Sequence, residues 1–210
     1  MLNLSELRKE YSFSTLDELQ VDKNPFQQFK IWFQTAAEKV LEPNAMHLST
    51  VLQGRPKGRI VLLKSVDNGF TFFTNYQSAK GQELQNNPAA AITFFWGEVE
   101  KQVRIEGLVT KIDPKESDEY FSVRPRESQL GAWASAQSSE IASRQELIDK
   151  YFQLMAEFEG EVIPRPQHWG GFKLIPDYFE FWQGGAGRLH DRIAYTKTEG
   201  SEWKISRLSS

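Results

Sequence analysis

The fold class is indicated most clearly by residues 59–75, Arg59-Ile60-Val61-Leu62-Leu63-Lys64-Ser65-Val66-Asp67-Asn68-Gly69-Phe70-Thr71-Phe72-Phe73-Thr74-Asn75. The runs 59–66 and 69–75 are rich in branched and aromatic side chains, which fit the pleated surface of a β-strand. Asp67-Asn68-Gly69 between them is a turn signal, because these residues readily adopt turn conformations. The stretch therefore predicts two strands separated by a turn.

The same alternation of strands and turns continues on both sides of this stretch. Further β-rich runs occur at 46–53, 89–96, 100–112, 171–182, 190–197 and 202–208. Helical patterns alternate with them, and the spacing predicts helices over 25–41, over 78–86, from Pro114 to near Arg124, and from Ser143 onward. Strand blocks punctuated by helices predict an α+β protein with a mostly antiparallel sheet or barrel. We expect the small, polar segment 131–139 to be a loop.

Composition limits the classes of protein to which this chain can belong. The 210 residues fit a single domain, and the absence of cysteine excludes disulfides, thiolate metal sites and cysteine nucleophiles. Lys plus Arg number 25 against 28 acidic residues, and this net charge of −3 argues against nucleic acid as the main partner. Neither a signal peptide nor a membrane-spanning run is visible. We therefore expect a cytoplasmic protein without a membrane partner.

The segment 182–192, Trp182-Gln183-Gly184-Gly185-Ala186-Gly187-Arg188-Leu189-His190-Asp191-Arg192, combines residues suited to chemistry on a phosphorylated small molecule. Its glycines allow close backbone approach to a ligand. Its arginines provide planar charged groups suited to phosphate, and its histidine can exchange a proton near neutral pH.

Other candidate residues are weaker when each segment is considered alone. Tyr120 and Arg124 share a helix face, and Ser128 after Pro125 would complete a phosphate clamp, although a surface tyrosine–arginine pair is equally consistent with the spacing. Thr74, Ser78 and Lys80 fit either an anion site or a capped turn. For the remaining candidates, an interpretation without any ligand is also open. Arg59 and Lys64 could be strand-end charges on opposite faces, and Gln102 could be an exposed strand position. Gln137 and Ser138 could belong to a functionless loop, and Arg8 and Tyr11 to a mobile tail.

Taken in order, these segments resemble the pyridoxine (pyridoxamine) 5′-phosphate oxidase family. The resemblance covers nearly the whole chain and depends on several motifs, namely Arg8-Lys9-Glu10-Tyr11, Arg59 through Lys64, Tyr120-Phe121-Ser122-Val123-Arg124-Pro125-Arg126-Glu127-Ser128-Gln129, Gly131-Ala132-Trp133, Gln137-Ser138-Ser139, Trp169-Gly170-Gly171-Phe172, Phe181-Trp182-Gln183 and Arg188-Leu189-His190-Asp191-Arg192.

The resemblance implies an FMN-binding split β-barrel with peripheral helices. It implies a mobile segment over 1–22, a single domain over 23–210, and a homodimer with two flavin sites lined by both subunits. A shared site would also explain how Arg59 and Lys64 could serve ligands from opposite strand faces. The implied FMN contacts are Arg59, Ile60, Val61, Leu62, Leu63, Lys64, Phe73, Thr74, Lys80, Gln102, Gln137, Ser138, Trp182 and Arg192.

The substrate contacts implied by the resemblance fall into three groups. They are Lys64, Tyr120, Arg124 and Ser128 around the phosphate, Arg188 and His190 over the pyridine ring as the catalytic pair, and Arg8 and Tyr11 as a mobile lid. Three positions differ from common family residues: Ala79 replaces a second basic residue, Phe73 a tyrosine, and Asn24 an aspartate. The Ala79 difference predicts the loss of one flavin-phosphate contact.

The implied reaction is FMN-dependent oxidation of pyridoxine or pyridoxamine 5′-phosphate to pyridoxal 5′-phosphate, in vitamin B6 salvage and biosynthesis. A hydride would pass from C4′ to flavin N5, and O2 would accept the electrons to give H2O2, with NH3 released from the amine. Two alternatives remain at this point. One is a non-catalytic carrier of flavin or pyridoxal phosphate, and the other is a split-barrel flavoreductase that uses a nicotinamide donor.

Overall fold

The computed structural model describes residue 4, residues 10–11 and residues 14–210. In this part of the chain, nine strands form one sheet: β1 (Ala45–Leu52), β2 (Arg55–Leu62), β3 (Ser65–Val66), β4 (Phe70–Asn75), β5 (Ala89–Trp96), β6 (Lys101–Lys111), β7 (Trp169–Gln183), β8 (Asp191–Lys197) and β9 (Trp203–Leu208). The helices are α1 (Pro25–Ala37), α2 (Ala79–Asn86), α3 (Pro114–Ser122), α4 (Arg126–Ala134) and α5 (Arg144–Glu157), with short 3₁₀ turns η1 (Gly97–Val99) and η2 (Ala186–Arg188).

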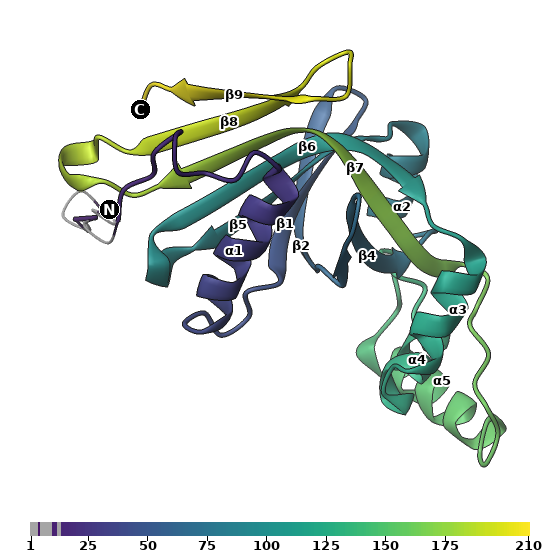
Figure 1. Cartoon of the computed structure of the whole chain (residues 1–210). Coiled ribbons are helices and arrows are strands. Elements are labelled where there is room, and N and C mark those ends of the chain that lie inside the picture. Colours follow the sequence, from purple (N-terminus) through teal and green to yellow (C-terminus); the bar gives the residue numbers. More distant parts are fainter. Residues whose placement is uncertain (1–3, 5–9, 12–13) are drawn as a thin grey trace.

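The sheet is antiparallel at every strand pair described. Its strand order is β2-β1-β5-β6-β7-β4-β3, and β8 and β9 extend from β7 (Figure 1). The prediction of an α+β protein with a mostly antiparallel sheet is therefore confirmed. None of the described helices is long and apolar enough to cross a membrane.

The long strand β7 connects the two ends of the molecule. Its first half pairs with β4 and its second half with β8, while β6 runs along its other edge. The β6–β7 register shifts between Glu106 and Gly107, where a Cβ on Gly107 would lie 2.1 Å from the Ile175 carbonyl oxygen. Glycine is required at this bulge, which bends the sheet. Figure 1 shows α3, α4 and α5 grouped near the start of β7 and η2 at its other end.

Helix α1 covers one face of the sheet and closes the main core. The Asn24 side chain caps it by accepting from the Phe26 amide, with Pro25 in the first turn as predicted. Phe29 and Trp32 on its inner face are 1% and 5% exposed. The helix ends at Ala37 rather than residue 41, and its end tightens into a turn in which the Lys39 amide donates to the Ala36 carbonyl three residues back.

A second, smaller core cluster lies under α3, α4 and α5. It consists of Phe121, Leu130, Ile163 and Trp169. The loop expected from 131 onward is wrong over its first residues, since α4 continues to Ala134. Pro125 supplies a φ of −51° at the start of this helix, and Gln129 Nε2 donates to the Phe121 carbonyl, which joins α4 to α3.

The strand predicted over 59–66 is in fact two strands. β2 begins earlier, at Arg55, and ends at Leu62, so Lys64 lies between β2 and β3. The argument that strand alternation places Arg59 and Lys64 on opposite faces is therefore wrong, because the two residues do not belong to one continuous strand.

Candidate active site

A cavity of about 480 Å³ lies between the end of β2, strand β4 and helices α3 and α4. It collects most of the residues predicted to bind phosphate and flavin. The described side chains around it include three cations and no carboxylate, and they are Ile60, Val61, Leu62, Lys64, Phe73, Thr74, Lys80, Tyr120, Val123, Arg124, Pro125, Ser128, Gln137 and Trp169. An anion is therefore the ligand that this cavity favours.

Arg124 is held in the cavity by aromatic rings. Its guanidinium carbon lies 4.5 Å from the centre of the Trp169 ring and 5.7 Å from that of Phe121. Burial lowers the pKa of Arg124 from its ordinary value. Its Nη1 atom is buried and has no hydrogen-bond partner among the described residues. A buried guanidinium nitrogen without an acceptor is costly, and a bound phosphate or carboxylate would supply that acceptor.

The remaining residues of the predicted phosphate clamp lie beside Arg124. The Tyr120 ring stacks on Phe73, with 4.0 Å between ring centroids. Ser128 and Lys64 line the same cavity. The structure thus brings Lys64, Tyr120, Arg124 and Ser128 together, as the sequence predicted.

A second cationic group lies nearby, around Lys80 at the start of α2. Lys80 Nζ donates to Thr74 Oγ1 at 3.2 Å, and Thr74 donates to Gln137 Oε1 at 3.2 Å. Burial lowers the pKa of Lys80, and the charge of Arg59 lowers it further, against the opposing charge of Glu83. The Lys80 ammonium is thus hydrogen-bonded to a hydroxyl in a site that disfavours its charge, so an added anion there would be stabilising.

Arg59 stands just outside the cavity and is paired with an acid. Its Nη2 lies 2.6 Å from Glu83 Oε2, and Thr50 Oγ1 donates to the same carboxylate oxygen at 2.6 Å. Burial opposes ionisation of Glu83, but the hydrogen bonds from Thr50 and Arg59 outweigh it and lower the pKa. Glu83 therefore forms an ion pair with Arg59, while its charge acts on Lys80 without a direct contact.

The second group of predicted residues lies around the turn between β7 and β8. We call its members, Tyr11, Trp182, Arg188 and His190, the turn group. The Tyr11 ring meets Trp182 edge-on at 5.5 Å and His190 at 5.6 Å, and the Trp182 and His190 rings are 4.8 Å apart. The Gly185 amide donates to His190 Nδ1 at 3.1 Å. Neutral His190 therefore carries its proton on Nε2, which is the tautomer able to donate to a ligand.

Arg188, in the same turn, has an unusual backbone conformation. Its φ is +63°, in the left-handed region, and its side chain is exposed. Non-glycine residues held in this region occur often at functional sites.

Gln102, Trp182 and Arg192 form one row across the sheet. They are paired in register on β6, β7 and β8, so their side chains share one face. Arg192 Nε donates to the buried Glu180 carboxylate at 3.0 Å, and this hydrogen bond raises the pKa of Arg192. Glu180 also accepts from Arg104 and Tyr178 at 3.2 Å.

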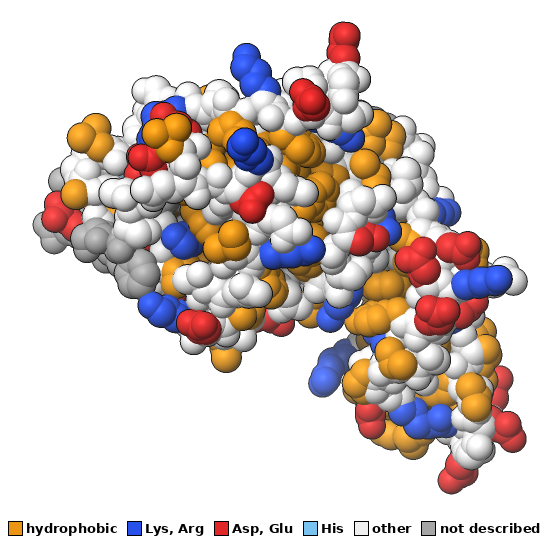
Figure 2. All heavy atoms as spheres, in the orientation of Figure 1, with side chains coloured by type: hydrophobic (Ala, Val, Ile, Leu, Met, Phe, Trp, Pro, Cys, Tyr) orange, Lys and Arg blue, Asp and Glu red, His pale blue; other side chains and the backbone are white. Residues whose placement is uncertain are grey.

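The two groups do not meet within one chain. Trp169 lines the cavity at the start of β7, and Trp182 belongs to the turn group thirteen residues later. A strand rises about 3.3 Å per residue, which separates these positions by roughly 40 Å along β7. Figure 2 shows the sheet body and the α3–α5 lobe as two parts of the surface, with basic side chains near their junction.

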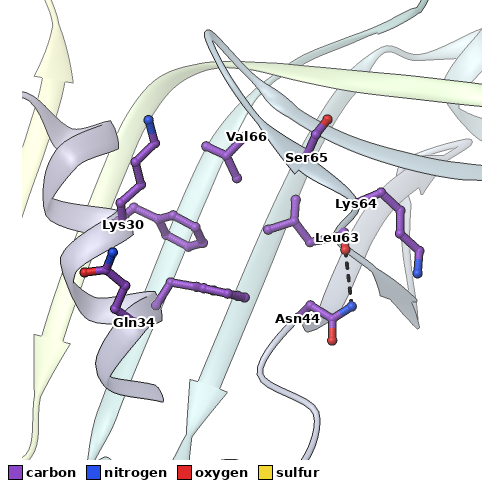
Figure 3. A pocket seen from close by; sticks show the side chains of 9 residues that line it. Lys30, Gln34, Asn44, Leu63, Lys64, Ser65 and Val66 are labelled. Carbon is purple, nitrogen blue, oxygen red and sulfur yellow. Dashed lines mark hydrogen bonds between the residues drawn. The ribbon is translucent and has the colours of Figure 1, made fainter. Parts of the chain in front are cut away.

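Two predicted residues lie elsewhere, and a third cannot be placed. Leu63 is 6% exposed and lines a different cavity, of about 330 Å³, beside α1. In Figure 3, Leu63 points toward α1, whereas Lys64 points away from the helix. Ser138 is exposed, does not line the 480 Å³ cavity, and has a φ of +72°. Arg8 lies outside the described residues.

Sequence reasoning missed three contributors to the site. Glu83 neutralises part of the Arg59 charge, Thr50 hydrogen-bonds to both Arg59 and Glu83, and Trp169 forms the wall against which Arg124 packs. Glu83 could have been found from sequence, because it lies three positions after Lys80 and so shares a helix face with it. Trp169 belonged to a recognised motif but had no assigned role, and nothing in the sequence pointed to Thr50.

Comparisons with known proteins identify the family to which the chain belongs. Residues 33–154 match the family model described as pyridoxamine 5′-phosphate oxidase, and residues 169–210 match the pyridoxine 5′-phosphate oxidase C-terminal dimerisation region. Proteins named pyridoxine/pyridoxamine 5′-phosphate oxidase are 53% identical in Paraburkholderia phytofirmans, over 100% of both chains, and 52% identical in Cyanothece sp., over 99% of both.

Solved structures show the same fold. The crystal structure of PhzG from Burkholderia lata 383 in complex with tetrahydrophenazine-1-carboxylic acid superposes with a TM-score of 0.88 at 31% identity, over 95% of this chain and 100% of that one. A pyridoxamine 5′-phosphate oxidase-related, FMN-binding protein from Nostoc punctiforme gives a TM-score of 0.72 at 16% identity, over 90% and 100% of the two chains. The split-barrel fold expected from the sequence is thus confirmed, and the chain belongs to the pyridoxine/pyridoxamine 5′-phosphate oxidase family.

Proposed function

We propose that this protein is a homodimeric, FMN-dependent oxidase that converts pyridoxine and pyridoxamine 5′-phosphates to pyridoxal 5′-phosphate, with O2 as electron acceptor. The observation that supports this most directly is the unpartnered Arg124 Nη1 in a cavity shared with Lys64, Tyr120 and Ser128. These are the groups that a phosphate monoester needs.

The cavity offers two separate sets of phosphate ligands. Lys64, Tyr120, Arg124 and Ser128 would hold the substrate phosphate. Lys80 would hold the phosphate of FMN, together with Thr74 and Gln137, to which it is linked by hydrogen bonds. The charge of Arg59 also acts on this position. Lys80 is buried and bonded only to a hydroxyl among the contacts described, so these residues fit an anionic cofactor. Ala79 would offer no second cation to this phosphate.

The turn group would complete the site from the partner subunit. Tyr11, Trp182, Arg188 and His190 carry aromatic, cationic and proton-donating groups, but they lie at the far end of β7 from the cavity. A second copy of the chain would bring its own turn group to this cavity. The match of 169–210 to a dimerisation region supports this arrangement, because that region contains β7, β8 and β9.

The residues would divide the chemistry between them. The clamp around Arg124 anchors a part of the substrate that does not react and uses that binding energy to align the C4′ carbon. His190, with its proton on Nε2, and Arg188 would orient the ring and the 4′ substituent. Bound FMN would supply the hydride acceptor and pass the electrons to O2, which gives H2O2, with NH3 released when the substrate is the amine.

The test is spectroscopic. The purified protein is expected to be yellow, to lose its flavin absorbance when pyridoxine 5′-phosphate is added anaerobically, and to consume O2 with either phosphorylated vitamer. Bleaching by NADPH instead of the vitamer would favour the flavoreductase. Vitamer binding without bleaching or O2 consumption would favour a non-catalytic carrier.

A further inference from the structure

Residues 14–22, which precede α1, are attached to the strands that carry the turn group. The Leu16 side chain is 8% exposed and belongs to the main core cluster. The Leu16 amide donates to Asp191 Oδ2 at 3.0 Å, at the first residue of β8. The Tyr195 hydroxyl donates to the Asp22 carbonyl at 2.7 Å.

Arg207 on β9 is the centre of this attachment. Its Nη1 donates to Asp191 Oδ1 at 2.7 Å, its Nε to Glu18 Oε2 at 2.8 Å, and its Nη2 to the Leu16 carbonyl at 2.9 Å. One guanidinium therefore binds the segment through a backbone oxygen and an acid, and binds β8 through another acid. A lysine could not make these three directional contacts.

The attachment lies close in sequence to Tyr11. Leu16 lies five positions after Tyr11, and five residue steps span at most about 17 Å. Fixing Leu16 on β8 thus keeps Tyr11 within reach of Trp182 and His190, which its ring contacts. A tethered group of this kind has a high local concentration at its binding place.

The Tyr11 ring occupies a space that is open because residue 184 is glycine. A Cβ on Gly184 would lie 2.7 Å from Tyr11 Cγ and 2.8 Å from its Cβ. The ring therefore packs directly on the Gly184 backbone, where any larger residue would displace it.

We infer that Arg207, together with Glu18 and Asp191, is a latch whose role is to position Tyr11 over the Trp182–His190 pair and so to set substrate affinity. Arg207 is a positioning residue and touches no reacting atom. This inference rests on the proposed function, since it assumes that the turn group meets substrate. The side chains of the latch are 25–42% exposed, so each ion pair contributes little to global stability. The latch governs the local detachment of residues 14–22 instead.

The experiment compares Arg207→Ala with Lys204→Ala, which removes a charge from an exposed position of the same strand. Hydrogen exchange at the Leu16 amide reports the latch without reference to activity. In the flavin-loaded enzyme, Arg207→Ala is expected to speed this exchange roughly tenfold and to raise KM for pyridoxine 5′-phosphate about fivefold, with kcat and thermal stability nearly unchanged. Lys204→Ala is expected to change neither quantity, and Arg207→Lys to give intermediate values.

Coupling to Tyr11 is tested by a double-mutant cycle. In a Tyr11→Ala background, Arg207→Ala is expected to raise KM no further, because the group that the latch positions is absent. Unchanged Leu16 exchange in Arg207→Ala, an unchanged KM, or fully additive effects with Tyr11→Ala would each overturn the inference. A wild-type protein that oxidises neither vitamer would refute the proposed function instead, and the latch itself would still be judged by Leu16 exchange.

Discussion

The guanidinium of Arg124 shows how a single residue can point to a ligand. It lies against Trp169 and Phe121, which exclude water from its flat face, and its Nη1 is left without an acceptor. Natural structures rarely bury a polar nitrogen in this state unless a ligand completes its hydrogen bonds. Sequence spacing placed Tyr120 and Arg124 on one face, but it could not distinguish a clamp from a surface pair.

Replacing Arg124 tests the clamp. Arg124→Ala removes hydrogen bonds to a charged group, each worth about 1.5–3 kcal/mol, so KM for the phosphorylated vitamer is expected to rise roughly 10- to 100-fold. The protein is expected to remain folded and yellow, because Lys80 and Arg59 are untouched. Arg124→Lys, which keeps the charge but loses the fork, is expected to fall in between. An unchanged KM in Arg124→Ala would refute the clamp.

Loss of Arg188 or His190 is predicted to affect kcat, whereas loss of Arg124 is predicted to affect KM. Arg188→Ala and His190→Ala are each expected to lower kcat at least tenfold while the flavin content stays near that of the wild type. His47→Ala, on β1 and in neither group, serves as the control for loss of a histidine. If either variant loses its flavin instead, that residue belongs to the cofactor site.

At the scale of elements, helix α2 illustrates a conflict between stability and binding. It places Lys80 and Glu83 three positions apart at the base of the cavity, with Ser78 as the cap. Burial lowers the pKa of Lys80, so the charged lysine is less stable in the folded chain than in the unfolded one. Lys80 therefore carries a stability cost, and the anion that we propose it binds would offset this cost.

This cost has a defined pH dependence. In flavin-free protein at pH 7, Lys80→Met is expected to raise stability by about 1 kcal/mol, or roughly 2–4 °C in Tm. As pH rises from the lowered pKa toward the ordinary value of 10.5, the folded wild type loses the proton that the unfolded chain retains, and its stability increases. The advantage of the variant should therefore shrink toward pH 10. A variant that is less stable at pH 7, or an advantage that does not change with pH, would contradict this account.

Elements with clear end signals were predictable from sequence, and elements that depend on tertiary contacts were not. Asn24, Asp113 and Ser143 cap helices as predicted, because an N-cap is a local hydrogen bond. The break between β2 and β3 and the start of α4 right after Pro125 were missed. Helix α4 is held by Gln129 and by the Leu130 contact with the second core cluster, and neither contact is local enough to be visible in the sequence.

At the scale of the whole molecule, the decisive feature is the length of β7. One strand carries Trp169 in the cavity and Trp182 in the turn group, so the two groups that we propose to form one site lie apart within one chain. The sequence predicted nearly all of these residues through family motifs. It could not predict their separation, or the pairing of Arg59 with Glu83, because both depend on strand register and on contacts between distant segments.

The most direct test of the shared site is complementation between Arg124→Ala and His190→Ala subunits. Each variant is unfolded and refolded with the other at equal concentration, and activity is measured well below KM. Half of the dimers formed are then mixed, and each mixed dimer has one site with a wild-type cavity and a wild-type turn group. The account predicts recovery of about a quarter of wild-type activity, compared with the low activity of either variant refolded alone. Activity in the mixture equal to the mean of the two parent variants would contradict it, since that result requires both groups of residues to act within one chain.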